Sequence, residues 1–218
     1  MNRTASARRI EVDPQRIVLW VNGFAKRHGS LTWSSTDRSV SLSASDGATA
    51  VLEPFVPGVA SRPGGLEGLA GWAEPATRLA LILVRRGGYA VGLGHEAELI
   101  AHKVGTRYVQ SRTAAGGWSQ HRFARRRDNQ ADALVVSVIE HTLRIVLASP
   151  SDALVVGGDK ALVRDVLADV RLARLAELPR RELFDLPDPK LVVLQQALRR
   201  GRAVRITLAE PDTRVVES

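Results

Sequence analysis

The chain has no cysteine, few aromatic residues and no long hydrophobic run. Its 218 residues include no Cys, and Phe, Trp and Tyr together make up 5%. The lack of thiols excludes disulfides, cysteine nucleophiles, thiolate zinc sites and iron–sulfur clusters. The five histidines show no metal-ligand spacing with carboxylates, so neither a metal nor another cofactor is expected. No segment is apolar enough to span a membrane and the N-terminus has no signal-peptide core, so a cytoplasmic protein without a membrane partner is expected.

Positive charge is in excess, and most of it is arginine. The chain has 31 basic and 23 acidic residues, a formal net charge of +8 and an isoelectric point near 10.8. Arginine makes bidentate contacts with phosphate and stacks on bases. The charge balance therefore favours a polyanionic partner. The only lysines are Lys26, Lys103, Lys160 and Lys190.

Composition divides the chain into three parts. Residues 1–56 are expected to form a small N-terminal α+β extension, in which a helix from Asp13 to Gly29 precedes an antiparallel meander. Residues 57–75 are rich in glycine and proline and predict a linker. Residues 76–218 are expected to form the main domain. The strands expected in the extension are 31–34, 39–43 and 48–55, and residues 1–9 are expected to be frayed.

The main domain has the pattern of an α/β fold with a mixed sheet. Short apolar strands are followed by amphipathic helices, an order that implies a crossover and some parallel pairing. The expected strands are 79–84, 89–93, 98–109, 154–156 and 203–208; the expected helices are 120–148, 160–176 and 190–200, the last capped by Gly201.

The helix expected at 120–148 is polar in its first half and apolar in its second. No glycine or proline interrupts it before Pro150, and a rise of 1.5 Å per residue makes it about 40 Å long. The second half has the spacing of a buried face. The sequence thus predicts an anchored helix whose basic end projects from the domain. The expected buried face comprises Ala131, Leu134, Val135, Val138, Thr142, Ile145 and Val146.

The stretch 112–130, RTAAGGWSQHRFARRRDNQ, joins a flexible loop to this helix. Gly116 and Gly117 offer backbone freedom. The arginines that follow place like charges on one helix face, near the helix N-terminus where the macrodipole favours anions. They indicate either a solvated basic face, which is common on exposed helices, or a surface for a phosphate-containing partner. These arginines are Arg122, Arg125, Arg126 and Arg127.

Two glycine-containing segments have weak similarity to phosphate-binding motifs. Residues 92–97, GLGHEA, match the loose dinucleotide pattern, but a strand is expected after them and the acidic residue about 20 positions later is missing. Residues 157–160, GGDK, follow a strand and precede a helix, but Asp159 repels anions and suits an N-cap. The structural interpretation is favoured for both.

Two further groups suggest catalysis only weakly. Ser119 lacks the following glycine of a hydrolase elbow, because His121 stands there, and is better interpreted as a helix N-cap. Three carboxylates lie near two prolines, but their spacing does not show convergence on a metal, so a solvated turn is favoured over a magnesium nuclease site. These are Glu182, Asp185 and Asp188.

The segment 105–131, GTRYVQSRTAAGGWSQHRFARRRDNQA, resembles the actinobacterial branch of the Vms-like release factors. These are peptidyl-tRNA hydrolases related to the catalytic domain of eukaryotic and archaeal peptide chain release factors. The resemblance extends more weakly, as an order of strands and helices, over 79–208, and does not reach the residues before the linker. It implies an RNase-H-like mixed sheet with flanking helices and one long helix carrying a Gly-Gly-x-x-Gln loop.

The resemblance also implies an activity. In the superfamily a Gly-Gly-Gln tip enters the peptidyl transferase centre and helps water attack the ester that joins peptide to tRNA. Gln120 corresponds to the catalytic glutamine, with Gly116 and Gly117 giving the loop its freedom, although Trp118 and Ser119 separate them here. A ribosome-associated peptidyl-tRNA hydrolase is implied, which releases nascent chains from stalled large subunits. No stop-codon reader is recognisable, so codon-independent action is expected. The protein is expected to be a monomer.

The implied partners are the large ribosomal subunit, through its rRNA, and peptidyl-tRNA. Trp118 is expected either to stack on a base or to pack the loop base. A non-catalytic ribosome or RNA binder is the main alternative, and a tRNA-acting nuclease is the weaker one. The residues expected to bind RNA are Lys103, Arg107, Arg112, Trp118, Arg122, Arg125, Arg126 and Arg127.

Overall fold

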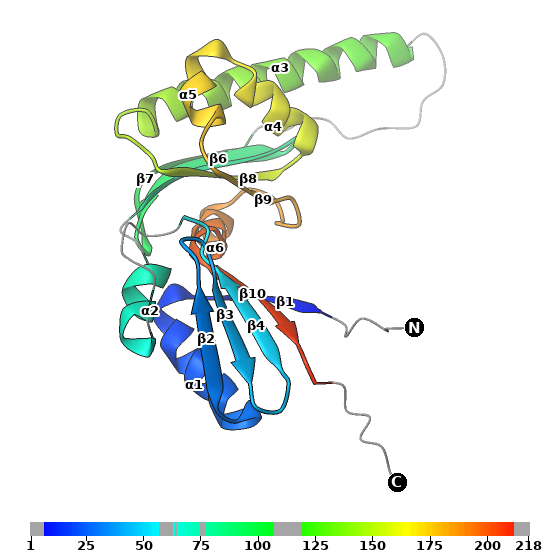
Figure 1. Ribbon diagram of the computed structural model, residues 1–218. Helices are drawn as coiled ribbons and strands as arrows, with labels where there is room; N and C mark the ends of the chain where they lie inside the picture. The colour runs from blue at the N-terminus through cyan, green and yellow to red at the C-terminus, as the bar shows by residue number, and fades with distance from the viewer. Residues whose placement is uncertain (1–6, 57–62, 64, 75–76, 107–118, 212–218) are drawn as a thin grey trace. The chain divides into compact units, whose positions relative to one another are not determined.

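The chain divides into two units, each with one five-stranded sheet (Figure 1). The first unit comprises residues 1–76 and 202–218, and the second comprises residues 77–201. The structure is a computed structural model that describes residues 7–56, 63, 65–74, 77–106 and 119–211, with the backbone alone for 119–129. None of the helices in this described part is long and apolar enough to cross a membrane.

In the first unit, short alternating strands form an antiparallel sheet with two helices packed on its core. The Asp13 carboxylate accepts a hydrogen bond from the Gln15 N–H at 3.0 Å and so starts the helical segment, as predicted. Gly29 ends it with a φ of 91°, which glycine adopts easily. The elements are β1 (Arg8–Val12), a 3-10 turn (Pro14–Arg16), α1 (Ile17–His28), β2 (Leu31–Ser35), β3 (Val40–Ala44), β4 (Thr49–Glu53), α2 (Leu66–Ala73) and β10 (Val204–Ala209), with sheet order β1-β10-β4-β3-β2.

Three parts of the first unit differ from the sequence-based expectation. β10 was expected in the main domain, but it pairs antiparallel with β1 and β4. Its alternating pattern suits any half-buried antiparallel position, so the pattern alone does not choose a sheet. The expected linker contains α2, because Leu69 and Trp72 are buried in the core of this unit. β1 lies partly within residues expected to be frayed.

In the second unit, a mixed sheet lies between helices, which confirms the predicted α/β class and mixed sheet (Figure 1). The first three strands pair antiparallel, whereas β8 pairs parallel with both β5 and β9. α3, α4 and α5 pack on one face and α6 on the other. The elements are β5 (Arg78–Arg85), β6 (Gly88–His95), β7 (Glu98–Thr106), α3 (Ser119–Ile145), β8 (Ala153–Gly158), α4 (Lys160–Leu167), α5 (Ala173–Ala176), β9 (Arg180–Leu183) and α6 (Leu191–Arg202), with sheet order β7-β6-β5-β8-β9.

Three details of this unit correct the sequence-based expectation. β9 was not predicted, because its four residues lie in a segment interpreted as a loop. The helix expected at 160–176 is broken, since Asp169 caps a new 3-10 turn by accepting from the Arg171 N–H at 2.9 Å. Gly201 lies inside α6 instead of capping it. Its glycine is required by packing, since a Cβ there would lie 2.7 Å from Val155 on β8.

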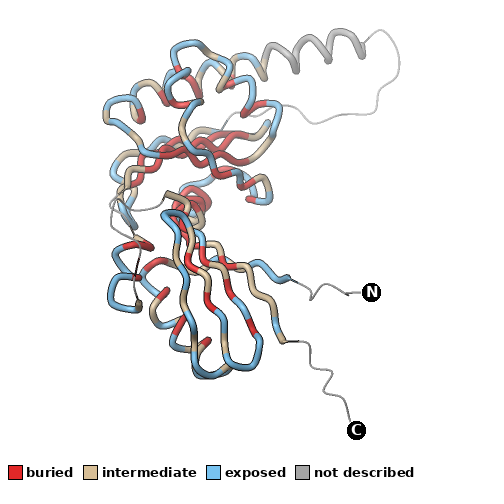
Figure 2. Tube along the Cα trace, viewed as in Figure 1, coloured by how far each residue is buried: buried red, intermediate tan, exposed pale blue. Residues whose placement is uncertain are grey.

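Apolar side chains of α3 are part of the core that Figure 2 colours red within the second unit. Leu134 and Val138 are fully buried, whereas Val136 on the same helix is 55% exposed. Leu134→Ala is expected to lower the free energy of unfolding by about 3 kcal/mol, because it removes buried methyl groups and leaves a cavity. Val136→Ala is the matched control, expected within about 0.5 kcal/mol of wild type in urea unfolding. Equal losses in both variants would contradict the anchoring of α3 through Leu134.

Candidate nucleic-acid interface and catalytic tip

The predicted long helix is present as α3, which begins at Ser119 and ends at Ile145. Gln120 is its second residue, and the four clustered arginines occupy positions 122–127. With a rise of 1.5 Å per residue, these arginines fall within about 12 Å of Ser119 along the helix axis. In Figure 1, this end of α3 extends beyond the strands of its own sheet. The backbone therefore places Gln120 and the arginines together at one end of an anchored helix.

Five of the eleven predicted catalytic and RNA-binding residues lie outside the described residues. Gly116, Gly117 and Trp118 are among them, as are Arg107 and Arg112. For Gln120 and for the arginines at 122 and 125–127, only the helical backbone is described. Their roles remain predictions. Lys103 is described, and it is an exposed residue of the edge strand β7.

The second half of α3 contacts β6 through a stack of two aromatic rings, one of which lies against β7. A Cβ on Gly105 would lie within 2.6 Å of the Tyr89 hydroxyl, so only glycine leaves room for that ring. The Tyr89 ring stacks on His141 of α3, with ring centroids 5.4 Å apart and an interplanar angle of 22°. Nearby, the buried Thr142 hydroxyl donates to the Val138 carbonyl at 2.7 Å and is thereby satisfied inside the core. These contacts hold the helix that carries Gln120 against its sheet.

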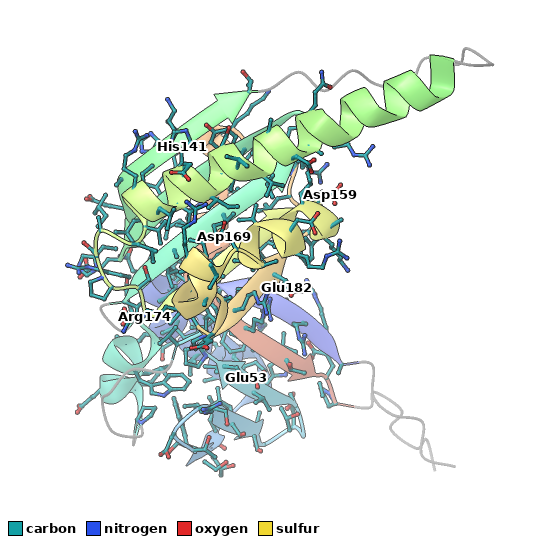
Figure 3. The ribbon with its side chains drawn as sticks, turned by 90° about the horizontal axis from the view of Figure 1, so that it is seen from above. Glu53, His141, Asp159, Asp169, Arg174 and Glu182 are labelled. Carbon is teal, nitrogen blue, oxygen red and sulfur yellow. The ribbon has the colours of Figure 1, made fainter. Side chains whose placement is uncertain are left out.

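His141, labelled in Figure 3, is influenced by two basic side chains and one acidic side chain. Burial lowers the pKa of His141 below its usual range, and the charges of Arg144 and Lys103 lower it further, against a smaller opposing effect of Glu140. The Arg144 Nη2 lies 2.8 Å from His141 Nδ1. Arginine can only donate, so Nδ1 is the acceptor and the imidazole is neutral in this arrangement. The sequence analysis did not single out His141 or Arg144, because their only signal was a position on the amphipathic helix.

The lowered pKa of His141 predicts a loss of stability in acid. The unfolded histidine titrates near 6.5, so the contribution is complete above that pH. It is lost as the pH falls through the lower pKa of the folded state, where protonation must overcome burial and neighbouring cations. Urea midpoints measured from neutral to mildly acidic pH should fall more for wild type than for His141→Gln. Parallel curves would contradict the assignment.

The two glycine-containing segments have structural roles, as favoured. Residues 92–97 belong to β6 and its turn into β7. A Cβ on Gly92 would approach Leu194 of α6 to 3.0 Å, and one on Gly94 would lie still closer to Leu198, so the lack of a side chain at both glycines lets α6 pack on the sheet. Asp159 caps α4, because its carboxylate accepts from the Ala161 N–H at 2.9 Å (Figure 3).

Two of the three acidic residues near the prolines form ion pairs with different arginines. Asp185 bonds Arg200 at 2.7 Å, and this hydrogen bond lowers the pKa of Asp185. Asp188 lies 3.7 Å from Arg85. Among the side chains that the structure describes, in residues 7–56, 63, 65–74, 77–106 and 130–211, no group of three His, Asp or Glu could hold a metal ion. Asp185 lies in a turn, as expected, whereas Glu182 belongs to the strand β9.

Comparison with known proteins identifies the family. No curated protein matches the chain. A solved structure described as "Vms1 mitochondrial localization core" is similar, with a TM-score of 0.47 and 13% sequence identity over 87% of this chain and 82% of that chain. Residues 77–207 match the family described as Actinobacteria/chloroflexi VLRF1 release factor, which confirms the resemblance first seen at 105–131. Because this match covers more than half of the chain, the protein belongs to the Actinobacteria/chloroflexi VLRF1 release factor family.

Proposed function

We propose that the protein is a ribosome-associated peptidyl-tRNA hydrolase that releases nascent chains from stalled large subunits without reading a codon. The observation that carries this proposal is the position of Gln120 in the first turn of α3, directly after the sequence Gly-Gly-Trp-Ser. Membership in a release factor family supports a role in ribosome-associated release or rescue. The second half of α3 packs in the hydrophobic core and so anchors the helix whose first turn contains Gln120.

In the proposed reaction, Gln120 needs only to orient the attacking water. A neutral amide donates and accepts hydrogen bonds but is a poor general base. Gln120 would therefore hold a water against the ester carbonyl carbon, where the oxygen attacks and the bond to the tRNA ribose oxygen breaks. The proton lost by the water ends on that ribose oxygen. Exclusion of bulk solvent by the surrounding RNA strengthens such hydrogen bonds.

The arginines would supply affinity. Arg122, Arg125, Arg126 and Arg127 lie on the same helix as Gln120, and phosphates would relieve their mutual repulsion at the N-terminal end of α3. Trp118, Arg107, Arg112 and Lys103 extend this proposed contact surface. The partners would be rRNA of the large subunit and peptidyl-tRNA, with the protein acting as a monomer in the cytoplasm.

The test uses purified large subunits that carry peptidyl-tRNA labelled in the peptide. Added protein is expected to yield free peptide together with tRNA that keeps its complete 3′ end. A shortened tRNA 3′ end would show a nuclease instead. Co-sedimentation with subunits but no peptide release would show a non-catalytic binder, for which Arg125→Ala with Arg126→Ala should abolish co-sedimentation.

A further inference from the structure

Three nitrogen-bearing side chains lie on the side of the sheet where α3 packs near the edge strand β7. They are Lys103 of β7 and His141 and Arg144 of α3, hereafter the Lys103–Arg144 cluster. Lys103 pairs with Val91 of β6 in the register that also pairs Gly105 with Tyr89. Side chains two positions apart on a strand share a face, so Lys103 lies on the α3 side of the sheet. Its charge also lowers the pKa of His141, in agreement with this position.

The cations of this cluster are not neutralised by acids of the described chain. Some exposed arginines of the same unit are paired: Arg164 lies 2.9 Å from Asp165, and Arg171 lies 2.9 Å from Asp169. In the part of the chain that the structure describes, neither Lys103 nor Arg144 has a carboxylate within ion-pair distance. The neighbouring Glu140 instead bonds Arg171 at 2.8 Å.

The cluster is also preorganised. Arg144 is exposed, yet its guanidinium is held by the hydrogen bond to His141 Nδ1. His141 is held in turn by its stack on Tyr89, whose ring lies against Gly105. A guanidinium with one N–H engaged keeps further donors for a bidentate contact with phosphate, and a lysine ammonium adds a compact point charge. Less side-chain freedom is then lost when an anion binds.

We propose that Lys103 and Arg144 form a second contact with the phosphate backbone of large-subunit rRNA, with His141 as the positioning residue for Arg144. Arg144 stands 24 residues after Gln120 on α3, which is about 35 Å along the helix axis. A contact so far from the ester is separate from the arginines at the tip. An rRNA backbone is the partner because a helix that inserts its tip into the peptidyl transferase centre is surrounded by rRNA phosphates. The inference rests on the proposed function and specifies its docking surface.

Salt-dependent binding to purified large subunits tests the contact. Each phosphate contact adds about one unit to the slope of log affinity against log salt concentration. Arg144→Gln and Lys103→Gln are each expected to weaken binding and to reduce the magnitude of the slope of log affinity against log salt concentration by about one. Arg164→Gln is the matched control, since it removes one exposed arginine that already pairs with Asp165, and it should keep the wild-type slope. Wild-type slopes in both cluster variants would overturn the proposal.

A second pair of variants tests the role of His141. His141→Phe keeps an aromatic ring over Tyr89 but removes the acceptor for Arg144, so it should reduce the slope as Arg144→Gln does. His141→Gln restores an acceptor oxygen and is expected to recover the wild-type slope, which a purely structural role of the ring would not predict. If both variants keep the wild-type slope, His141 has no positioning role.

Two further measurements separate the possible partners and the two proposals. Protein-free large-subunit rRNA should show the same dependence on Lys103 and Arg144; an effect seen only with complete subunits would indicate an acidic ribosomal protein and overturn the rRNA contact. Peptide release reports on the proposed function independently of the slope. A wild type that shows the cluster-dependent slope but releases no peptide would refute the hydrolase and leave the docking contact standing, whereas no binding at all would overturn both.

Discussion

Gln120→Ala is expected to lower the rate of peptide release from large subunits by about 100-fold, in the range found when one preorganised hydrogen-bond donor is removed from an active site. The amide would orient the attacking water only at the reacting centre, so its loss acts on the transition state more than on binding. The measurement is single-turnover release of labelled peptide from large subunits at saturating protein. Subunit affinity should change little, because the arginines at 122–127 and the Lys103–Arg144 cluster are unchanged.

The matched control for this variant is Gln195→Ala on α6. Gln195 is an exposed helical glutamine, so the same chemical change there should leave release unaltered. Release by Gln120→Ala at the wild-type rate would reject the catalytic role of Gln120. The other family features would then point to a backbone or rRNA group as the one that orients the water.

Gly158→Ala is expected to lower the free energy of unfolding by about 4 kcal/mol, the sum of a strained backbone conformation and an overpacked contact. Gly158 ends β8 with a φ of 101°, a region that L-residues with a Cβ rarely adopt. An added Cβ would also lie 2.8 Å from the Val84 carbonyl carbon and still closer to its oxygen. That oxygen already accepts from the Asp159 N–H, at 2.8 Å, where the chain turns into α4.

Gly87→Ala provides the control, because Gly87 is exposed and a Cβ there would meet no atom within 4 Å. Its expected effect is within about 0.5 kcal/mol. Both variants should be followed by far-ultraviolet circular dichroism in urea, since Trp20, Trp33 and Trp72 report on the other unit. A loss as small in Gly158→Ala as in Gly87→Ala would show that this turn relaxes without strain.

Local features were predictable because they depend on neighbours along the chain. The Asp13 and Asp159 caps each use an N–H two residues later, and both were predicted from the sequence. The extent of α3 followed from the spacing of its apolar residues and from the lack of glycine and proline between Gln120 and Pro150. The tip was recognised from residues 105–131, and the family match over 77–207 confirms that resemblance.

Features that depend on distant segments were missed or misplaced. β10 alternates like any half-buried strand, and only pairing with β1 and β4 assigns it to the first unit. The requirement for glycine at positions 92, 94 and 201 arises from the close packing of α6, which no local pattern records. Glycine is required at position 105 for a similar reason, because a Cβ there would clash with the ring of Tyr89, 16 residues earlier in the chain.

The division of the candidate site follows the same principle. The sequence by itself predicted an anchored helix and, next to it, a glycine-containing segment with Gln120 and four arginines, because a short motif and helical periodicity are both contiguous in the chain. Only the tertiary structure placed Lys103 of β7 on the face of the sheet on which α3 packs, and left Lys103 and Arg144 without an ion pair among the described residues. The reason is physical: the sheet register and the packing of α3 set the distance between charges that lie about forty residues apart.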